Sequence, residues 1–102
     1  MTTHKPGIRR CLLALIEREH CGLPAIAAAA EAISADARFN HWFANTAKAQ
    51  ISEGRALELL ALYNEIVAQC DFAVARFESN NDTAELRREL ISVAARLDEA
   101  IA

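Results

Sequence analysis

Three side chains of types that bind metals lie within one helical turn near the start of the sequence. Glu17, His20 and Cys21 occupy the i, i+3 and i+4 positions of a predicted helix, which places them on one face. A zinc site needs further ligands, and His41 or Cys11 would have to complete the set. The sequence holds neither a Cys-x-x-Cys nor a His-x-x-x-His pair. We therefore expect a solvated helix end here, with no metal and no cofactor.

The cysteines are not expected to act as catalytic nucleophiles. Nucleophilic catalysis requires a Cys or Ser beside a His and an orienting partner. Cys70 falls on an apolar helix face, where a cysteine packs as a small hydrophobe. Cys21 lies beside His20, but the sequence offers no glycine turn or oxyanion site near it. The chain has three glycines, and none belongs to a phosphate-holding loop. We predict no catalytic residue and no enzyme activity.

Composition and charge are typical of a small, mildly acidic globular protein. A chain of 102 residues predicts a single domain, 1–102. A net charge of −3 and a pI of about 5.6 give no general attraction for nucleic acid or anionic membranes. Three cysteines, an odd number, indicate free thiols in a reducing compartment. The apolar run at 11–16 is too short for a signal peptide or a membrane span. We therefore expect a cytoplasmic protein without a membrane partner.

The clearest element is a helix predicted over residues 53–79. Its apolar side chains recur at alternating steps of four and three residues, which is typical of a helix with one buried face. This predicted seam comprises Ala56, Leu60, Tyr63, Val67, Cys70, Val74 and Phe77. A second row widens the seam enough for a globular bundle; it comprises Leu59, Ile66 and Ala73. Ser52 is the predicted N-cap.

A second helix is predicted over residues 83–101, after a break at 79–81. Asp82 and Glu85 have the spacing of a capping box. The apolar stripe of this helix comprises Leu86, Leu90, Val93, Leu97 and Ile101. So short a connection predicts that the two helices are antiparallel neighbours. The longer helix then keeps an uncovered N-terminal end.

The N-terminal half is predicted to hold shorter helices. Residues 8–20 form the first, Gly22 ends it, and Pro24 begins an alanine-rich helix that continues to Ile33. Ser34 is predicted to cap a further segment with an aromatic cluster, comprising Phe39, Trp42 and Phe43. We expect this cluster to dock on the uncovered end of the long helix. No strand-like alternation is present, so the predicted fold class is all-α. It is a four- to five-helix bundle with a long C-terminal antiparallel hairpin and a broken, alanine-rich N-terminal layer.

A helix-turn-helix DNA-binding regulator, using residues 8–47, is the alternative function. The Ile-Ala-x-x-Ala start of the alanine helix and a Ser at the head of the next segment are typical of many bacterial repressors. In this layout the turn lies at 32–34 and the recognition helix follows from Ala35. Its polar readers would be Arg38, Asn40, His41 and Asn45. Phosphate contacts need Lys and Arg, so nucleic acid is the less favoured partner.

The favoured function is a non-catalytic protein-interaction module. A helix that is apolar nearly all round is normally buried, and a small core cannot easily cover it on every side. We predict that Ile26, Ala30 and Ile33 face inward and that an outer alanine face meets a second copy or a partner protein. The protein would then be a homodimeric adaptor or a small acidic chaperone-like protein. The predicted interface comprises Ala25, Ala28, Ala29, Ala32, Trp42 and Phe43.

Overall fold

The described part of the protein is built from helices. The computed structural model describes residues 7–18, 21–47 and 50–102. Its elements are α1 (Ile8–Arg18), α2 (Leu23–Trp42), the π-helical turn η1 (Phe43–Ala47), α4 (Glu53–Asn80) and α5 (Thr83–Ala100). No strand occurs in these ranges. The all-α prediction is confirmed.

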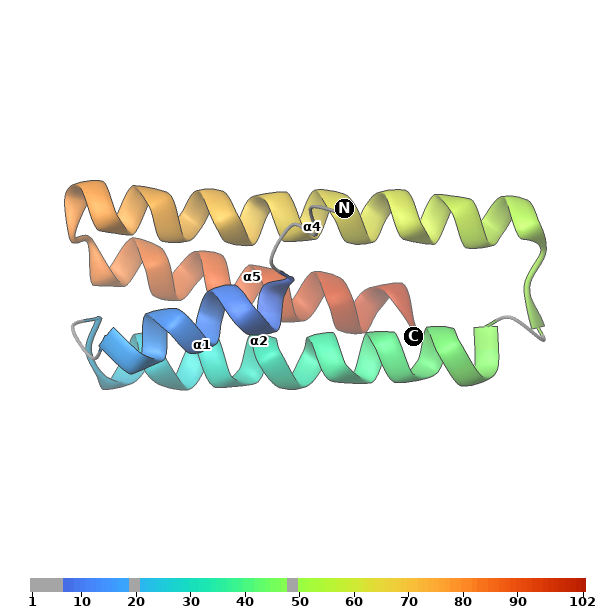
Figure 1. The fold of residues 1–102 in the computed structure, drawn as a ribbon, viewed down its shortest axis with the longest axis horizontal. Helices are drawn as coiled ribbons and strands as arrows, with labels where there is room; N and C mark the ends of the chain where they lie inside the picture. The colour runs from blue at the N-terminus through green and yellow to red at the C-terminus, as the bar shows by residue number, and fades with distance from the viewer. Residues whose placement is uncertain (1–6, 19–20, 48–49) are drawn as a thin grey trace, which may run out of the picture.

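The helices form a flat bundle. Helices α2 and α4 lie along its long axis at the two edges, and α5 lies between them (Figure 1). Helix α5 packs against both α2 and α4, and α1 also packs against both. The bundle extends over 42 × 34 × 18 Å. An α-helix with its side chains is about 10 Å across, so the bundle is about two helices thick.

Helix α1 is short and covers only half of the length of α2 and α4. It lies over the first half of α2 and the second half of α4 (Figure 1). Ile8, Leu12 and Leu15 are its buried side chains. The other half of the bundle holds the end of α2, the turn η1 and the start of α4. Aromatic side chains, described below, fill the inner space there.

Helix α2 is continuous through the predicted break. It begins after Gly22, which has a positive φ of 84°, with Pro24 in the first turn, as predicted. The predicted cap at Ser34 is wrong, since α2 runs on to Trp42 and Ser34 is an exposed residue within it. Residues 27–37 hold no Gly or Pro and are mostly alanine, the strongest helix former. The helix-turn-helix layout therefore lacks the turn predicted at 32–34.

The alanine face of α2 points into the bundle, the reverse of the predicted orientation. The buried alanines belong to one core with the apolar side chains of α5; they are Ala25, Ala28, Ala29, Ala32 and Ala35. Ala27 and Ala30 are exposed, and Ile26 and Ile33 are half-buried. Small side chains let two helices approach closely, and α2 and α5 make the most extensive helix–helix contact of the described residues. The alanines are therefore the packing surface of the core.

The caps of α4 and α5 match the sequence prediction. The Arg55 amide donates to Ser52 Oγ over 3.1 Å, and the Glu85 amide donates to Asp82 Oδ1 over 3.0 Å. The Glu85 carboxylate does not complete a capping box. It accepts two hydrogen bonds from Arg76, of 2.9 and 3.0 Å, and so joins the end of α4 to the start of α5.

The buried face of α4 is rotated from the predicted seam. Its most buried side chains lie on the row that was expected only to widen the seam and on the later seam positions; they are Leu59, Ile66, Val67, Cys70, Ala73, Val74 and Phe77. Leu60 is 43% exposed, although it was predicted to be in the seam. Helix α1 does not reach this end of α4 (Figure 1), which agrees with the exposure of Leu60 among the described residues.

Replacement of Ala29 by Leu should destabilise the protein. Ala29 is fully buried, and added methylenes in a packed core typically cost about 1–3 kcal/mol. The matched control is Ala30→Leu, because Ala30 is its exposed neighbour on α2; its effect should stay within about 0.5 kcal/mol. Urea unfolding followed by circular dichroism measures both changes. Equal effects of the two substitutions would contradict the orientation of α2.

Candidate functional site

The three cysteines occupy different environments. Cys21 and Cys70 are buried, and Cys11 on α1 is half-buried. A hydrogen bond from the Cys70 thiol lowers the pKa of Cys11, and the same contact, together with burial, raises the pKa of Cys70. Burial also raises the pKa of Cys21. Cys70 was predicted to lie on the buried face of the long helix, and its burial confirms this prediction.

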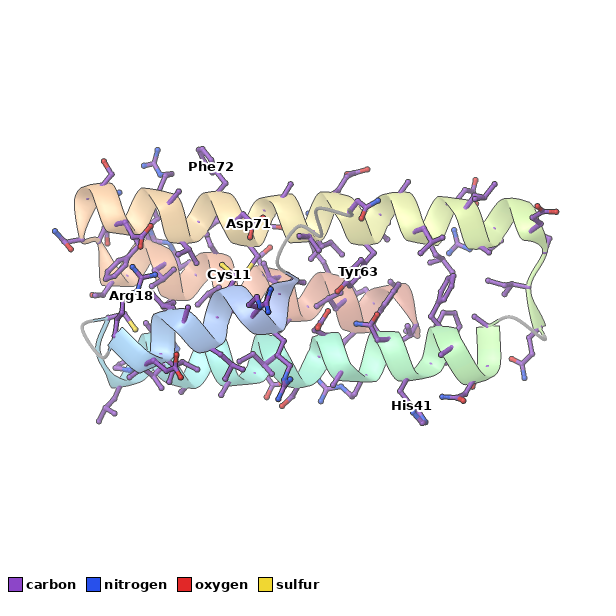
Figure 2. All side chains as sticks on the ribbon, in the orientation of Figure 1. Cys11, Arg18, His41, Tyr63, Asp71 and Phe72 are labelled. Atoms are coloured by element: carbon purple, nitrogen blue, oxygen red, sulfur yellow. The ribbon has the colours of Figure 1, made fainter. Side chains whose placement is uncertain are left out.

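The predicted metal-type ligands do not come together in the described part of the chain. His20 lies outside the described residues. His41 is on the outer side of α2 and points away from the bundle (Figure 2), where it contacts Asn45. Among residues 7–18, 21–47 and 50–102, no group of three or more His, Cys, Asp or Glu side chains is placed to hold a metal ion.

A buried polar contact links α2 to α4. The Tyr63 hydroxyl donates to Asp36 Oδ1 over 2.6 Å, and Asn40 Nδ2 donates to the same oxygen over 3.1 Å. Asp36 is 7% exposed. Burial raises the pKa of Tyr63 to about 12, and the contact with Asp36 contributes to this rise. Tyr63 therefore stays protonated near neutral pH, so that it serves as a hydrogen-bond donor rather than as a base.

The aromatic cluster contacts the first half of α4 through Tyr63; its docking on the N-terminal end of that helix stays a prediction. The Phe39 and Tyr63 rings are stacked with their centroids 5.1 Å apart. Phe43 and Trp42 lie 6.1 and 6.4 Å from Phe39. Phe39 is buried, whereas Trp42 and Phe43 are half-buried. The cluster fills the half of the bundle that α1 does not cover.

A row of uncharged side chains follows the side of α4 that faces away from the bundle. We call this row the outer stripe; it comprises Leu57, Ala61, Asn64, Ala68, Phe72 and Ala75. All six residues are exposed, Leu57 by 62% and Phe72 by 64%. The steps of three and four residues keep them on one helix face, and Figure 2 shows Phe72 pointing away from the bundle. The outer stripe is the candidate functional site.

Charged side chains border the outer stripe on both edges. One edge carries Glu58, Glu65 and Arg76, and the other edge carries Glu53, Asp71 and Glu78. Arg76 lies 6.0 Å from the centre of the Phe72 ring. An apolar centre with a charged rim is the usual composition of a protein interface. Sequence reasoning missed this surface because the heptad analysis followed only the buried face of α4. The available signal was Leu57 and Phe72, which lie opposite that face.

A cleft borders the outer stripe. It lies between Gly7, at the start of α1, and the middle of α4, and has a volume of ≈ 720 Å³. Its lining includes Ala68 and Phe72 of the outer stripe, together with Asp71 and Val67. The cleft thus joins the outer stripe to the start of α1, with the polar Asn64 and the charged Asp71 among its lining residues.

The other large exposed apolar side chains are scattered. Leu13 lies on α1, Leu23 at the start of α2, Leu60 on α4 outside the outer stripe, and Ile91 on α5. Single exposed apolar residues are normal on soluble proteins, whereas a contiguous row marks an interaction surface. The outer stripe of α4 is therefore distinguished by continuity and not by any single residue.

Comparison with known proteins identifies no relative. No protein-family model, no curated protein and no solved structure matches this chain. In the described part of the chain, no helix combines the length and hydropathy needed to cross a membrane.

Thiol reagents should modify Cys11 before the other two cysteines. Cys11 is half-buried and its pKa is lowered, whereas Cys21 and Cys70 are buried with raised pKa values; the thiolate is the reactive form. Reaction with a chromogenic disulfide reagent, followed by peptide mass spectrometry, measures the order. Cys11→Ser should remove the fast phase. Fast modification of Cys70 in the native protein would contradict its place in the core.

Replacement of Tyr63 by Phe should cost about 1 kcal/mol, because Asp36 loses a hydrogen bond. The pKa of Tyr63 is raised in the folded state, so its ionisation opposes folding. This contribution to stability is complete below the unfolded pKa, about 10, and is lost as the pH rises towards about 12. Urea unfolding at pH 8 and at several higher pH values should therefore show a steeper loss for the native protein than for Tyr63→Phe. Identical slopes would contradict the assigned contact.

Proposed function

We propose that the protein is a non-catalytic helical interaction module that forms a homodimer through the outer stripe of α4. The observation that supports this proposal is the continuous exposed row from Leu57 to Ala75. A surface helix normally carries charged or polar residues on its solvent side. The solvent side of α4 instead carries leucine, phenylalanine and alanines, with Asn64 as its polar member.

A second copy suits this surface because a two-fold dimer pairs the same patch on both subunits. The patch must then carry both the projections and the spaces that receive them. The outer stripe has both, since Leu57 and Phe72 project beside the small residues Ala61, Ala68 and Ala75. A partner of another sequence would not require this mixture on one face.

The dimer proposed here uses a different surface from the interface predicted from sequence. Ala25, Ala28, Ala29 and Ala32 are buried by α5 within a single chain and have almost no free surface for a second copy. Trp42 and Phe43 are half-buried beside Phe39. Contact of a second copy with the Trp42–Phe43 end of the bundle stays a prediction. We therefore place the main interface on α4, because its apolar side chains are exposed to solvent, whereas the alanines of α2 are buried.

The helix-turn-helix alternative gains no support from the described residues. Arg38, the one cation among the predicted DNA readers, donates to both carboxylate oxygens of Asp98 over 3.0 Å. It also donates to Glu31 over 3.0 Å. A phosphate would have to compete with two carboxylates for this guanidinium. The pairing of Arg38 and the continuity of α2 both count against the helix-turn-helix alternative.

Light scattering coupled to size exclusion tests the proposal. The native protein should have twice the mass of one chain at about 100 µM, a concentration that populates even a micromolar dimer. Phe72→Glu should shift the mass to that of a monomer, because it places a carboxylate in the apolar contact.

Ile91→Glu is the matched control for the dimer. Ile91 is an exposed apolar residue of α5, outside the outer stripe, so its replacement should leave the dimer intact. Circular dichroism should show that both variants keep their helix content. A native protein that is monomeric at this concentration would refute the homodimer.

A further inference from the structure

We propose that Cys11 of α1 and Cys70 of α4 form a reversible disulfide when the protein meets a hydroperoxide. The bond would lie inside one chain, so the inference does not depend on the proposed homodimer. It would make the attachment of α1 to α4 respond to oxidation. The contact between the two thiols, their unlike chemistry and the modest attachment of α1 support the proposal.

The two thiols are in direct contact where α1 packs against α4. Cys70 belongs to the buried core, and Cys11 packs against that core from α1. The Cys70 thiol donates a hydrogen bond to the sulfur of Cys11. Figure 2 shows Cys11 on the side of α1 that faces α4. Two free thiols with their sulfur atoms in contact are the starting arrangement for a disulfide.

The third cysteine lies in another part of the bundle. Cys21 lines a separate pocket together with Pro24 of α2 and with Thr83 and Arg87 of α5. This pocket belongs to the contact between α2 and α5, whereas the Cys11 thiol lies between α1 and α4. The geometry therefore favours one pairing, and Cys21 serves as an internal control for it.

The two paired thiols have unlike reactivity. The hydrogen bond from Cys70 lowers the pKa of Cys11, although Asp71 and Glu78 oppose this effect. The same contact and burial raise the pKa of Cys70. Because the thiolate is the nucleophile, Cys11 is the thiol that meets the oxidant. Cys11 is half-buried, and Asp71, which contacts it, lines the cleft beside the outer stripe, so a small peroxide has a route to it.

The first step oxidises Cys11. Its thiolate attacks one oxygen of the hydroperoxide, and the O–O bond breaks. The departing oxygen takes a proton from water, and Cys11 becomes a sulfenic acid, S–OH.

The second step closes the disulfide. The Cys70 sulfur attacks the Cys11 sulfur, the S–O bond breaks, and the hydroxyl group leaves as water with the Cys70 proton. The two thiols have then lost two electrons and two protons, and the hydroperoxide has been reduced to water and an alcohol or a second water. A small thiol reverses the bond by exchange.

Helix α1 is an element whose attachment such a bond would change. It has 11 residues, of which three are buried. Its other link to α4 is the exposed ion pair of Arg18 with Glu78, and exposed pairs add little stability. A disulfide would fix the middle of α1 to α4. It would also close more than half of the chain into one loop, which restricts the unfolded state.

Peptide mass spectrometry of the oxidised native protein tests the pairing. The reduced full chain is treated with hydrogen peroxide, its remaining thiols are alkylated, and it is digested without reductant. The intact chain should lose the mass of two hydrogens and gain one alkyl group, on Cys21, and the Cys11 and Cys70 peptides should be linked. Dithiothreitol should restore three free thiols. Three alkylated cysteines, a link through Cys21, or a Cys11 sulfinic acid beside a free Cys70 would overturn the proposal.

Two cysteine variants test the order of the steps. In Cys70→Ala the sulfenic acid of Cys11 has no partner, so dimedone, a reagent for sulfenic acids, should label Cys11. Cys21→Ala is the matched control, because it removes the other buried thiol and should leave the Cys11–Cys70 link intact. Circular dichroism should show that both variants keep their helix content. A folded Cys70→Ala chain without dimedone label on Cys11, or loss of the link in Cys21→Ala, would contradict the mechanism.

A charge variant tests the surroundings of Cys11. Asp71 raises the pKa of Cys11, so Asp71→Asn should increase the thiolate fraction and the rate of peroxide oxidation at neutral pH. Glu99→Gln is the matched control, since it removes the same charge at an exposed position of α5 and should leave the rate unchanged. Equal rates for Asp71→Asn and the native protein would overturn the placement of Cys11 against α4, on which the disulfide depends.

Hydrogen exchange and urea unfolding test the consequence for α1. Oxidised protein should unfold at a higher urea concentration than reduced protein, and dithiothreitol should abolish the difference. Amides of α1 should exchange more slowly after oxidation, whereas those at the start of α4, which α1 does not cover (Figure 1), should change less. A disulfide that forms but leaves exchange in α1 unaltered would refute the control of α1 by oxidation.

Discussion

The bundle depends on the close contact between the alanine face of α2 and α5. The direct contact between α2 and α4 is made by the side chains of Asp36, Phe39 and Tyr63, whereas α5 packs along both helices. Alanines on α2 bring α5 near enough for Leu90, Val93 and Leu97 to share one core with α4. Larger residues on α2 would push α5 outward and separate it from α4. The small side chains thus set the spacing of all the long helices.

This spacing explains the division of the bundle into two halves. Where α1 is present, its leucines and isoleucine fill the space over α2 and α4. Where α1 is absent, Phe39 and Tyr63 stack across the same gap, and Asp36 receives the Tyr63 hydroxyl. Aliphatic side chains of α1 in one half and the Phe39–Tyr63 stack in the other half thus both hold α2 and α4 together. The outer stripe of α4 takes no part in either, which leaves it free for a binding role.

The sequence was sufficient to predict where most helices lie and which residues cap them. It was not sufficient to predict which side of each helix is buried. The Ser52 and Asp82 caps depend on residues within one turn, so local spacing is sufficient to find them. The continuity of α2 through Ser34 depends on the helix propensity of the surrounding alanines, which outweighs a single possible cap. Whether an alanine face points inward depends on the partner helix 60 residues away, as in the Arg38–Asp98 pair. Local patterns carry no information on that partner.

For the same reason the outer stripe could not be assigned from periodicity alone. Helix α4 has apolar residues on two opposite sides, and a heptad count cannot tell which side the rest of the chain covers. The buried side is decided by the short α1 and by α5, which pack on α4 from two directions. Only the assembled bundle shows that Leu57 and Phe72 stay in contact with water.

The central position of α5 has a consequence for the order of events during synthesis. Helix α5 follows in the chain the two long helices, α2 and α4, that it holds together. While a ribosome is still making residues 83–100, α2 and α4 have the short α1 to pack on but lack their most extensive partner, α5. The nascent chain must therefore wait, with its alanine and leucine faces open to solvent, until α5 emerges. Its α2–α5 core can close only at the end of synthesis, because these distant contacts are also the most extensive ones.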